Sequence, residues 1–129
     1  MNIGLGAKRR TILLVDADPH ARATLRTALE RAGFTVGEAA DRHEGERTAL
    51  RVHPDAVLAD LPHDALDAGG RIAARLKEGG RHVPVYIVSS VVDALVGSVG
   101  LDALGVSGVF CKPIDPTVII QTLKTRLGA

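Results

Sequence analysis

Short apolar runs alternate with longer amphipathic segments along the whole chain. The apolar runs span residues 11–15, 34–36, 56–59, 83–88 and 108–111. Each is short and is followed by a polar residue or glycine, which is typical of buried strands. Run 83–88 is apolar without alternation, so it predicts a strand that is covered on both faces of its sheet.

The segments between these runs have the apolar spacing of helices. They predict helices at residues 19–32, 42–52, 70–78, 92–104 and 116–127. The pairs Asp18-Pro19 and Asp115-Pro116 each combine an N-cap acid with a proline at the first helical position. Five strand–helix units with short connections predict one α/β domain with a doubly wound parallel sheet.

Polar side chains stand directly after the predicted strands. They are Asp16, Asp18, Asp60, Ser89 and Lys112. The carboxyl ends of parallel strands share one edge of the sheet, where such folds bind their ligands. These side chains are therefore expected to converge on one pocket. Carboxylates, a hydroxyl and an ammonium group together can handle a divalent cation and a phosphoryl group.

Composition narrows the choice of partners and compartment. The 129 residues are 46% apolar and 24% charged, which fits one globular domain, and the net charge of +1 argues against nucleic acid as the main partner. The apolar stretch 83–106 is interrupted by Pro84, Asp93 and Asp102, so it does not predict a membrane span. A single cysteine, Cys111, is expected to be a small core residue of a reduced, cytoplasmic protein.

Four motifs in order resemble the receiver domain of two-component response regulators. They are ILLVDADP, PDAVLADL, VPVYIVSS and GVFCKPID, and the resemblance extends over residues 11–127, leaving 1–10 as an N-terminal tail. It implies a flavodoxin-like (βα)5 fold with a five-stranded sheet of order 2-1-3-4-5. It also implies a signalling module, not an enzyme, that holds Mg²⁺ and takes a phosphoryl group from a sensor histidine kinase or a histidine phosphotransfer protein.

The resemblance assigns a role to each of five residues. Asp60 corresponds to the phosphoacceptor and also to a metal ligand, and Asp16 to the first acid that places the metal. Lys112 corresponds to the lysine that contacts the phosphoryl oxygens. Pro113 corresponds to the proline that follows a cis peptide bond, and Ser89 to the hydroxyl that moves toward the phosphate.

The chain departs from the family pattern around the expected metal. Ala17 replaces the second acid of the pair, which leaves fewer fixed ligands and less negative charge for Mg²⁺. The neighbouring Asp18 has two candidate roles, as a metal ligand or as a helix cap. Pro62 keeps the backbone carbonyl that the family uses as a ligand. Val109 replaces the aromatic residue that usually moves with the switch hydroxyl.

Two other functions compete with the phosphoacceptor. A pseudo-receiver, which would bind a partner without being phosphorylated, is favoured by Ala17 and Val109 and opposed by the retained Asp60, Ser89 and Lys112. A small phosphohydrolase would need an additional cap or a general acid near Asp60, and His63 is adjacent in sequence, although a lone loop histidine is most often only solvated. If Ala129 is the natural end, the chain is a stand-alone receiver without a DNA-binding output. Its apolar segment 92–104 would allow a homodimer.

Overall fold

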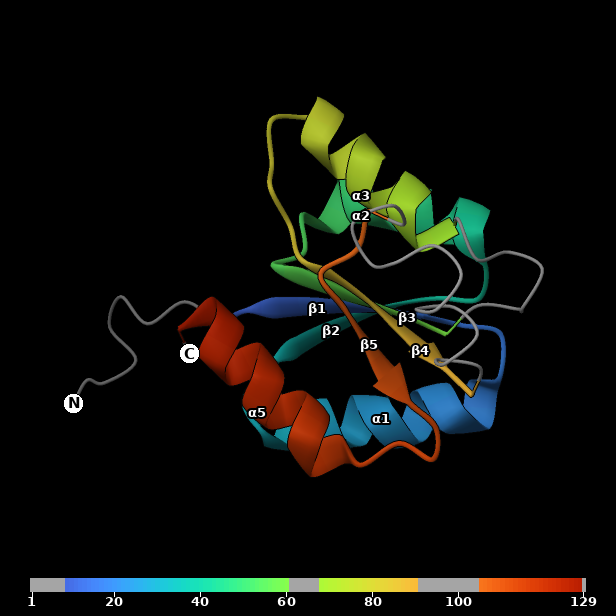
Figure 1. Cartoon of the computed structure of the whole chain (residues 1–129), viewed down its shortest axis with the longest axis vertical. Helices are drawn as coiled ribbons and strands as arrows, with labels where there is room; N and C mark the ends of the chain where they lie inside the picture. Colours follow the sequence, from blue (N-terminus) through green and yellow to red (C-terminus); the bar gives the residue numbers. More distant parts are fainter. Residues whose placement is uncertain (1–8, 61–67, 91–104, 129) are drawn as a thin grey trace.

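The fold is a parallel sheet between two layers of helices. The computed structural model describes residues 9–60, 68–90 and 105–128. The strands are β1 (Thr11–Asp16), β2 (Thr35–Ala39), β3 (Ala56–Asp60), β4 (Val85–Ser89) and β5 (Gly108–Cys111), in the order β2-β1-β3-β4-β5. The described helices are α1 (Pro19–Arg31), α2 (Arg42–Val52), α3 (Ala68–Glu78) and α5 (Pro116–Leu127). Helices α1 and α5 cover one face of the sheet, and α2 and α3 the other (Figure 1).

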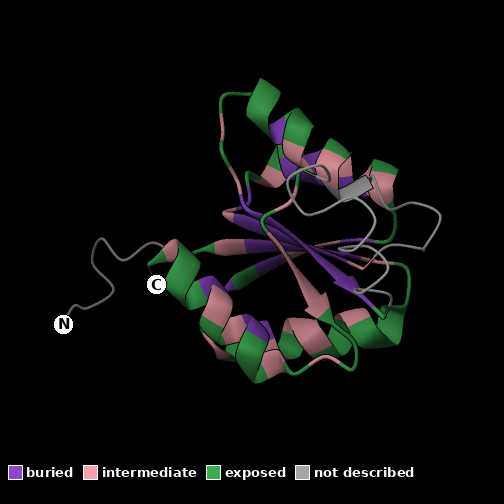
Figure 2. Cartoon of the chain, in the orientation of Figure 1, coloured by how far each residue is buried: buried purple, intermediate pink, exposed green. Residues whose placement is uncertain are grey.

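Both faces of the central strands are buried, which explains why β1 is apolar without alternation. Ile12 and Leu14 pack in the cluster with Leu29 of α1 and Leu123 of α5. Their neighbours on β1 face the opposite side and pack against α2 and α3. The buried residues accordingly concentrate along the strands and on the helix surfaces that face them (Figure 2).

The helix boundaries follow the capping residues. Asp18 accepts hydrogen bonds from the backbone of the first turn of α1, and Asp115 caps α5 in the same way, with a proline following each. Asp41 is the N-cap of α2, a role that the sequence interpretation did not assign. These side chains satisfy backbone N–H groups that have no partner inside the helix.

The predicted sheet order is confirmed, with small differences at the ends of elements. β2 begins at Thr35, just after the buried Phe34, and continues beyond the apolar run 34–36 to Ala39. Helix α3 begins at Ala68 rather than Gly70. The predicted helix at 92–104 lies outside the described residues. Within the described part of the chain, no helix has the length and apolar character needed to cross a membrane.

The expectation that Cys111 is a core residue is wrong. Cys111 is exposed. It is the last residue of β5, the edge strand of the sheet, which pairs on one side only, with β4. An apolar run predicts a strand but does not tell an edge strand from a central one, and so the burial of its last residue was overestimated.

The contact of α5 with the sheet gives a test of the packing. Leu123 is fully buried, so Leu123→Ala is expected to lower the free energy of unfolding by about 2–5 kcal/mol through lost burial and a residual cavity. Val118 on the same helix is 49% exposed, and Val118→Ala is expected to change stability by less than about 0.5 kcal/mol. Urea unfolding of both variants measures the difference. Equal losses would contradict the described orientation of α5.

Candidate functional site

Two carboxylates meet at the carboxyl edge of the sheet. Asp16 at the end of β1 and Asp60 at the end of β3 are register partners in the parallel ladder. Burial raises the pKa of Asp16 above its ordinary value of 3.8, a hydrogen bond from the Asp18 backbone opposes this, and the charge of Asp60 adds to the increase. The pair therefore forms a partly desolvated site of negative charge that favours a cation.

Lys112 supplies a cation to this site. Its Nζ lies 2.6 Å from Oδ2 of Asp60, whose side chain is 18% exposed. The hydrogen bond to Asp60 raises the pKa of Lys112 above 10.5, although burial acts in the opposite direction. The peptide bond between Lys112 and Pro113 is cis, and the Lys112 N–H donates to the carbonyl of Ser89 at 3.0 Å. The hydrogen bond to Ser89 thus fixes the backbone that carries the ammonium group beside the Asp60 carboxylate.

Of its two candidate roles, Asp18 performs the capping one. Its Oδ1 accepts from the backbone N–H groups of His20 and Ala21 at 2.9 and 3.4 Å, and its own N–H donates to Oδ1 of Asp16 at 2.9 Å. In the described ranges, no group of three or more His, Cys, Asp or Glu side chains is arranged to hold a metal ion. Asp16 and Asp60, which are register partners on neighbouring strands, are the two acids placed together at this edge. Pro62 lies outside the described residues.

A pair of carboxylates is chemically suited to Mg²⁺. This ion is usually held through one or two carboxylates together with substrate phosphates and several waters. Ala17 is exposed and its methyl group cannot be a ligand. The two carboxylates therefore fit a magnesium ion whose other ligands would be water molecules and a phosphoryl group.

Ser89 lies at the same edge. It ends β4, is 9% exposed and is the register partner of Cys111 on β5. Asp60 pairs with Val88, so Ser89 stands one residue beyond the level of Asp60 in the sheet. Asp16, Asp60, Ser89 and Lys112, which the sequence places far apart, are thus brought to one edge.

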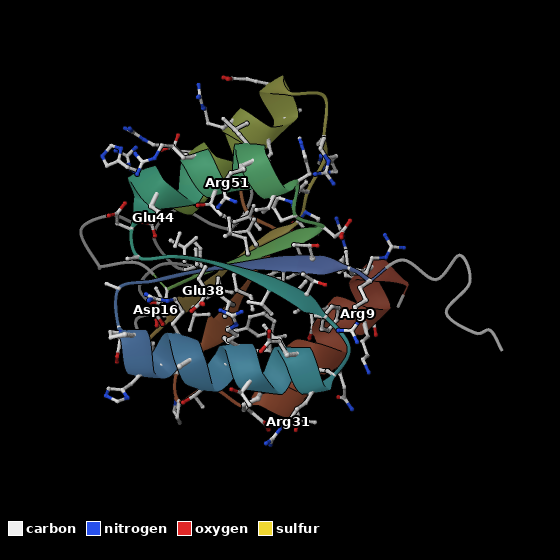
Figure 3. The ribbon with its side chains drawn as sticks, turned by 180° about the vertical axis from the view of Figure 1, so that it is seen from behind. Arg9, Asp16, Arg31, Glu38, Glu44 and Arg51 are labelled. Atoms are coloured by element: carbon white, nitrogen blue, oxygen red, sulfur yellow. The ribbon has the colours of Figure 1, made fainter. Side chains whose placement is uncertain are left out.

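Arg22 is part of the site and was missed at the level of sequence. From α1 its Nη1 donates to the backbone carbonyl of Asp16 at 2.5 Å, and its Nε donates to Glu38 at 3.0 Å. Arg26 also pairs with Glu38. Figure 3 shows Glu38 and Asp16 at the same end of the sheet, next to α1. A cation in the first turn of a helix is unfavourable toward the helix dipole, and this was the available sign that Arg22 has a tertiary partner.

The arginine pair gives Glu38 a pH-dependent role. Burial would raise the pKa of Glu38, but hydrogen bonds from Arg22 and Arg26 outweigh it and hold the pKa below 4.5. A lowered pKa means that the charged form stabilises the fold above pH 4.5, and that this stability is lost as the pH falls through the folded pKa. Glu38→Gln is expected to cost about 1 kcal/mol or less at pH 7, because these pairs are partly exposed.

Urea unfolding across the acid range measures this difference. The difference in the free energy of unfolding between the parent and Glu38→Gln should become smaller as the pH falls below 4.5. Glu78→Gln is the matched control, since Glu78 is 68% exposed and pairs only at 3.8 Å with Arg75 on its own helix. A gap for Glu38→Gln that is independent of pH would contradict the role of its charge.

The sheet order and the acidic edge define the flavodoxin-like class of α/β proteins that bind ligands at the carboxyl ends of their strands. A family model for the response regulator receiver domain matches residues 12–124, and the chain therefore belongs to this family. It is 33% identical over 129 residues to the transcriptional regulatory protein PrrA of Mycobacterium leprae, covering 98% of this chain and 53% of PrrA. The chain spans about half the length of this relative.

Solved structures support the same assignment. The receiver domain of a sensor histidine kinase from Pseudomonas aeruginosa PAO1 has a TM-score of 0.78 at 25% identity, covering 95% of this chain and 100% of that one. That domain has a magnesium ion coordinated in its active-site cleft. The chemotaxis protein CheY4 of Vibrio cholerae has a TM-score of 0.73 at 22% identity, covers 92% and 98% of the two chains, and supports the fold alone. Family membership is consistent with two-component signalling.

Proposed function

We propose that the chain accepts a phosphoryl group on Asp60 from a phosphohistidine of a sensor histidine kinase or a phosphotransfer protein. The observation that carries the proposal is the position of the Lys112 ammonium, which lies 2.6 Å from the Asp60 carboxylate. Asp16, a second acid, is the register partner of Asp60 on the neighbouring strand. A surface ion pair would not need a second acid, whose burial raises its pKa. A phosphoryl-transfer site needs all three groups, because it must bring negative charges together.

In the proposed step, a carboxylate oxygen of Asp60 attacks the phosphorus atom. A bond forms between this oxygen and phosphorus while the bond from phosphorus to the histidine nitrogen breaks, and the electron pair of that bond stays on the imidazole. Lys112 changes its partner from the carboxylate to an oxygen of the phosphoryl group. The hydroxyl of Ser89 is proposed to donate to another phosphoryl oxygen.

Asp16 and Asp60, with the carbonyl of Pro62, are the proposed ligands of Mg²⁺. The ion would supply positive charge to the phosphoryl oxygens as negative charge develops on them. Arg22 contributes by donating a hydrogen bond to the backbone carbonyl of Asp16, which fixes the backbone at this position. The proposed role of Asp18 is to keep the start of α1, and with it this loop, in place.

Intact mass after incubation with a small phosphodonor tests the proposal. The parent protein is expected to gain one phosphoryl group in the presence of Mg²⁺ and much less in its absence, and Asp60→Asn is expected to gain none. Glu78→Gln is the control, because Glu78 is 68% exposed at the C-terminal end of α3 and pairs with Arg75 of its own helix. Incorporation in Asp60→Asn equal to that of the parent would reject Asp60 as the acceptor.

A pseudo-receiver is the second candidate, and one observation favours it. The Asp18 carboxylate is engaged as a helix cap, so with Ala17 the β1–α1 junction offers Asp16 as the acid that faces Asp60. A folded parent protein that takes no phosphoryl group from either a small donor or a phosphorylated phosphotransfer protein would support this candidate over the first.

A further inference from the structure

A basic hollow lies at the edge of the sheet opposite to Asp60. It has a volume of about 450 Å³, and it is lined by Arg10, Asp55, Arg81 and Arg126 together with His82. Arg10 precedes β1, Asp55 precedes β3 and Arg81 precedes β4, while Arg126 stands near the end of α5. The hollow thus collects residues from the amino ends of the strands. Figure 3 shows Arg9 at this end of the molecule and Asp16 at the other.

The positive charge of this hollow is only partly balanced. Oδ1 of Asp55 lies 3.9 Å from Nη1 of Arg10 and 3.9 Å from Nη2 of Arg81, which is too long for a hydrogen bond. Its Oδ2 accepts from the backbone N–H of Thr11 at 2.7 Å. Three arginines therefore line a hollow with one carboxylate that is already engaged with the backbone, so the lining favours an added anion.

The guanidinium group of Arg81 is also incompletely hydrogen-bonded. Its Nη1 is buried and has no partner among the described residues. A buried donor without an acceptor is unfavourable, and more so when it is charged. An oxyanion in the hollow would give this guanidinium an acceptor and would let its planar fork bind two oxygens at once.

We propose that this hollow binds a small anion that carries two or more phosphate groups. Its volume is in the range of small-molecule sites, which is about 300–1,000 Å³. Arginines that approach from three separate segments fit an anion with several oxygens better than a single carboxylate. The cations meet in one hollow rather than along a stripe, which favours a compact ligand over a nucleic acid backbone. The site is separate from the acidic edge and does not depend on phosphorylation of Asp60.

Pyrophosphate is the probe for the experiment, in a buffer without Mg²⁺ and at constant ionic strength. Without the metal, the edge with Asp16 and Asp60 repels this anion, so binding reports on the basic hollow. Isothermal titration calorimetry is expected to show one site with a dissociation constant below about 1 mM, and the melting temperature should rise with pyrophosphate because the ligand binds the folded state. Sodium chloride at equal ionic strength should not reproduce the rise.

Arg81→Gln and Arg126→Gln are each expected to weaken pyrophosphate binding at least tenfold. Arg31→Gln is the matched control, since Arg31 lies in the last turn of α1 and does not line the hollow. Arg126 is exposed on α5, so its variant keeps the test valid if Arg81→Gln fails to fold. The proposal is overturned if pyrophosphate does not bind, or if Arg31→Gln weakens binding as much as Arg126→Gln.

Discussion

Lys112→Met is expected to slow phosphoryl transfer to Asp60 by about 10²–10³-fold, the effect of removing one preorganised charged donor from a transfer site. The Lys112 ammonium lies 2.6 Å from the Asp60 carboxylate, and the hydrogen bond from the Lys112 backbone N–H to the carbonyl of Ser89 fixes the backbone that carries it. Methionine has a similar length but carries no charge. The transferring oxygens would therefore lose a cation that the fold has already positioned.

The rate of phosphoryl gain from a small donor at saturating Mg²⁺ measures this effect. Lys124→Met is the control, because Lys124 lies in the last turn of α5, away from the site. Mg²⁺ affinity gives a second readout. It should rise in Lys112→Met, because the two carboxylates lose their competing cation. Transfer at the parent rate, or a weaker affinity for Mg²⁺, would contradict the role assigned to Lys112.

Ala17→Asp is expected to tighten Mg²⁺ binding about tenfold or more, because the affinity of such sites rises with the number of charged oxygen ligands. Ala17 is exposed beside Asp16, so a longer side chain at this position meets no buried neighbours. Asp18 would remain the cap of α1. The added carboxylate would then complete the acid pair that the family pattern predicts at this junction.

Calorimetric titration with Mg²⁺ measures the change. Ala23→Asp is the matched control. Ala23 is exposed on α1, so this substitution adds the same charge away from the end of β1. A fixed ligand predicts a large effect at position 17 and a small one at position 23. Equal tightening in both variants would mean that the total charge, and not a ligand at position 17, governs the affinity.

Features that depend on neighbouring residues were predictable from the sequence. The caps Asp18 and Asp115 act through backbone groups two or three residues away, so a short motif determines them. The apolar runs predicted the strands, and the motifs of the family predicted their order. The meeting of Asp16 and Asp60 followed, because the carboxyl ends of parallel strands share an edge.

Features that depend on residues far apart in the sequence could not be predicted from it. Whether Asp18 would bind a metal or cap a helix depended on which way its side chain turned, and the sequence left both open. Arg22 reaches Glu38 on another strand, a pairing that spacing along the chain does not reveal. The basic hollow is assembled from segments that are far apart in sequence, and its three arginines lie outside the motifs.

The location of the phosphoryl group tests the central claim most directly. The phosphorylated parent protein would be digested, and the modified peptide would be sequenced by tandem mass spectrometry after chemical trapping of the acyl phosphate. One phosphoryl group on Asp60, formed in a Mg²⁺-dependent reaction, is the predicted result. A phosphoryl group on any other residue, or none on a folded protein given both a small donor and a phosphorylated phosphotransfer protein, would contradict the account.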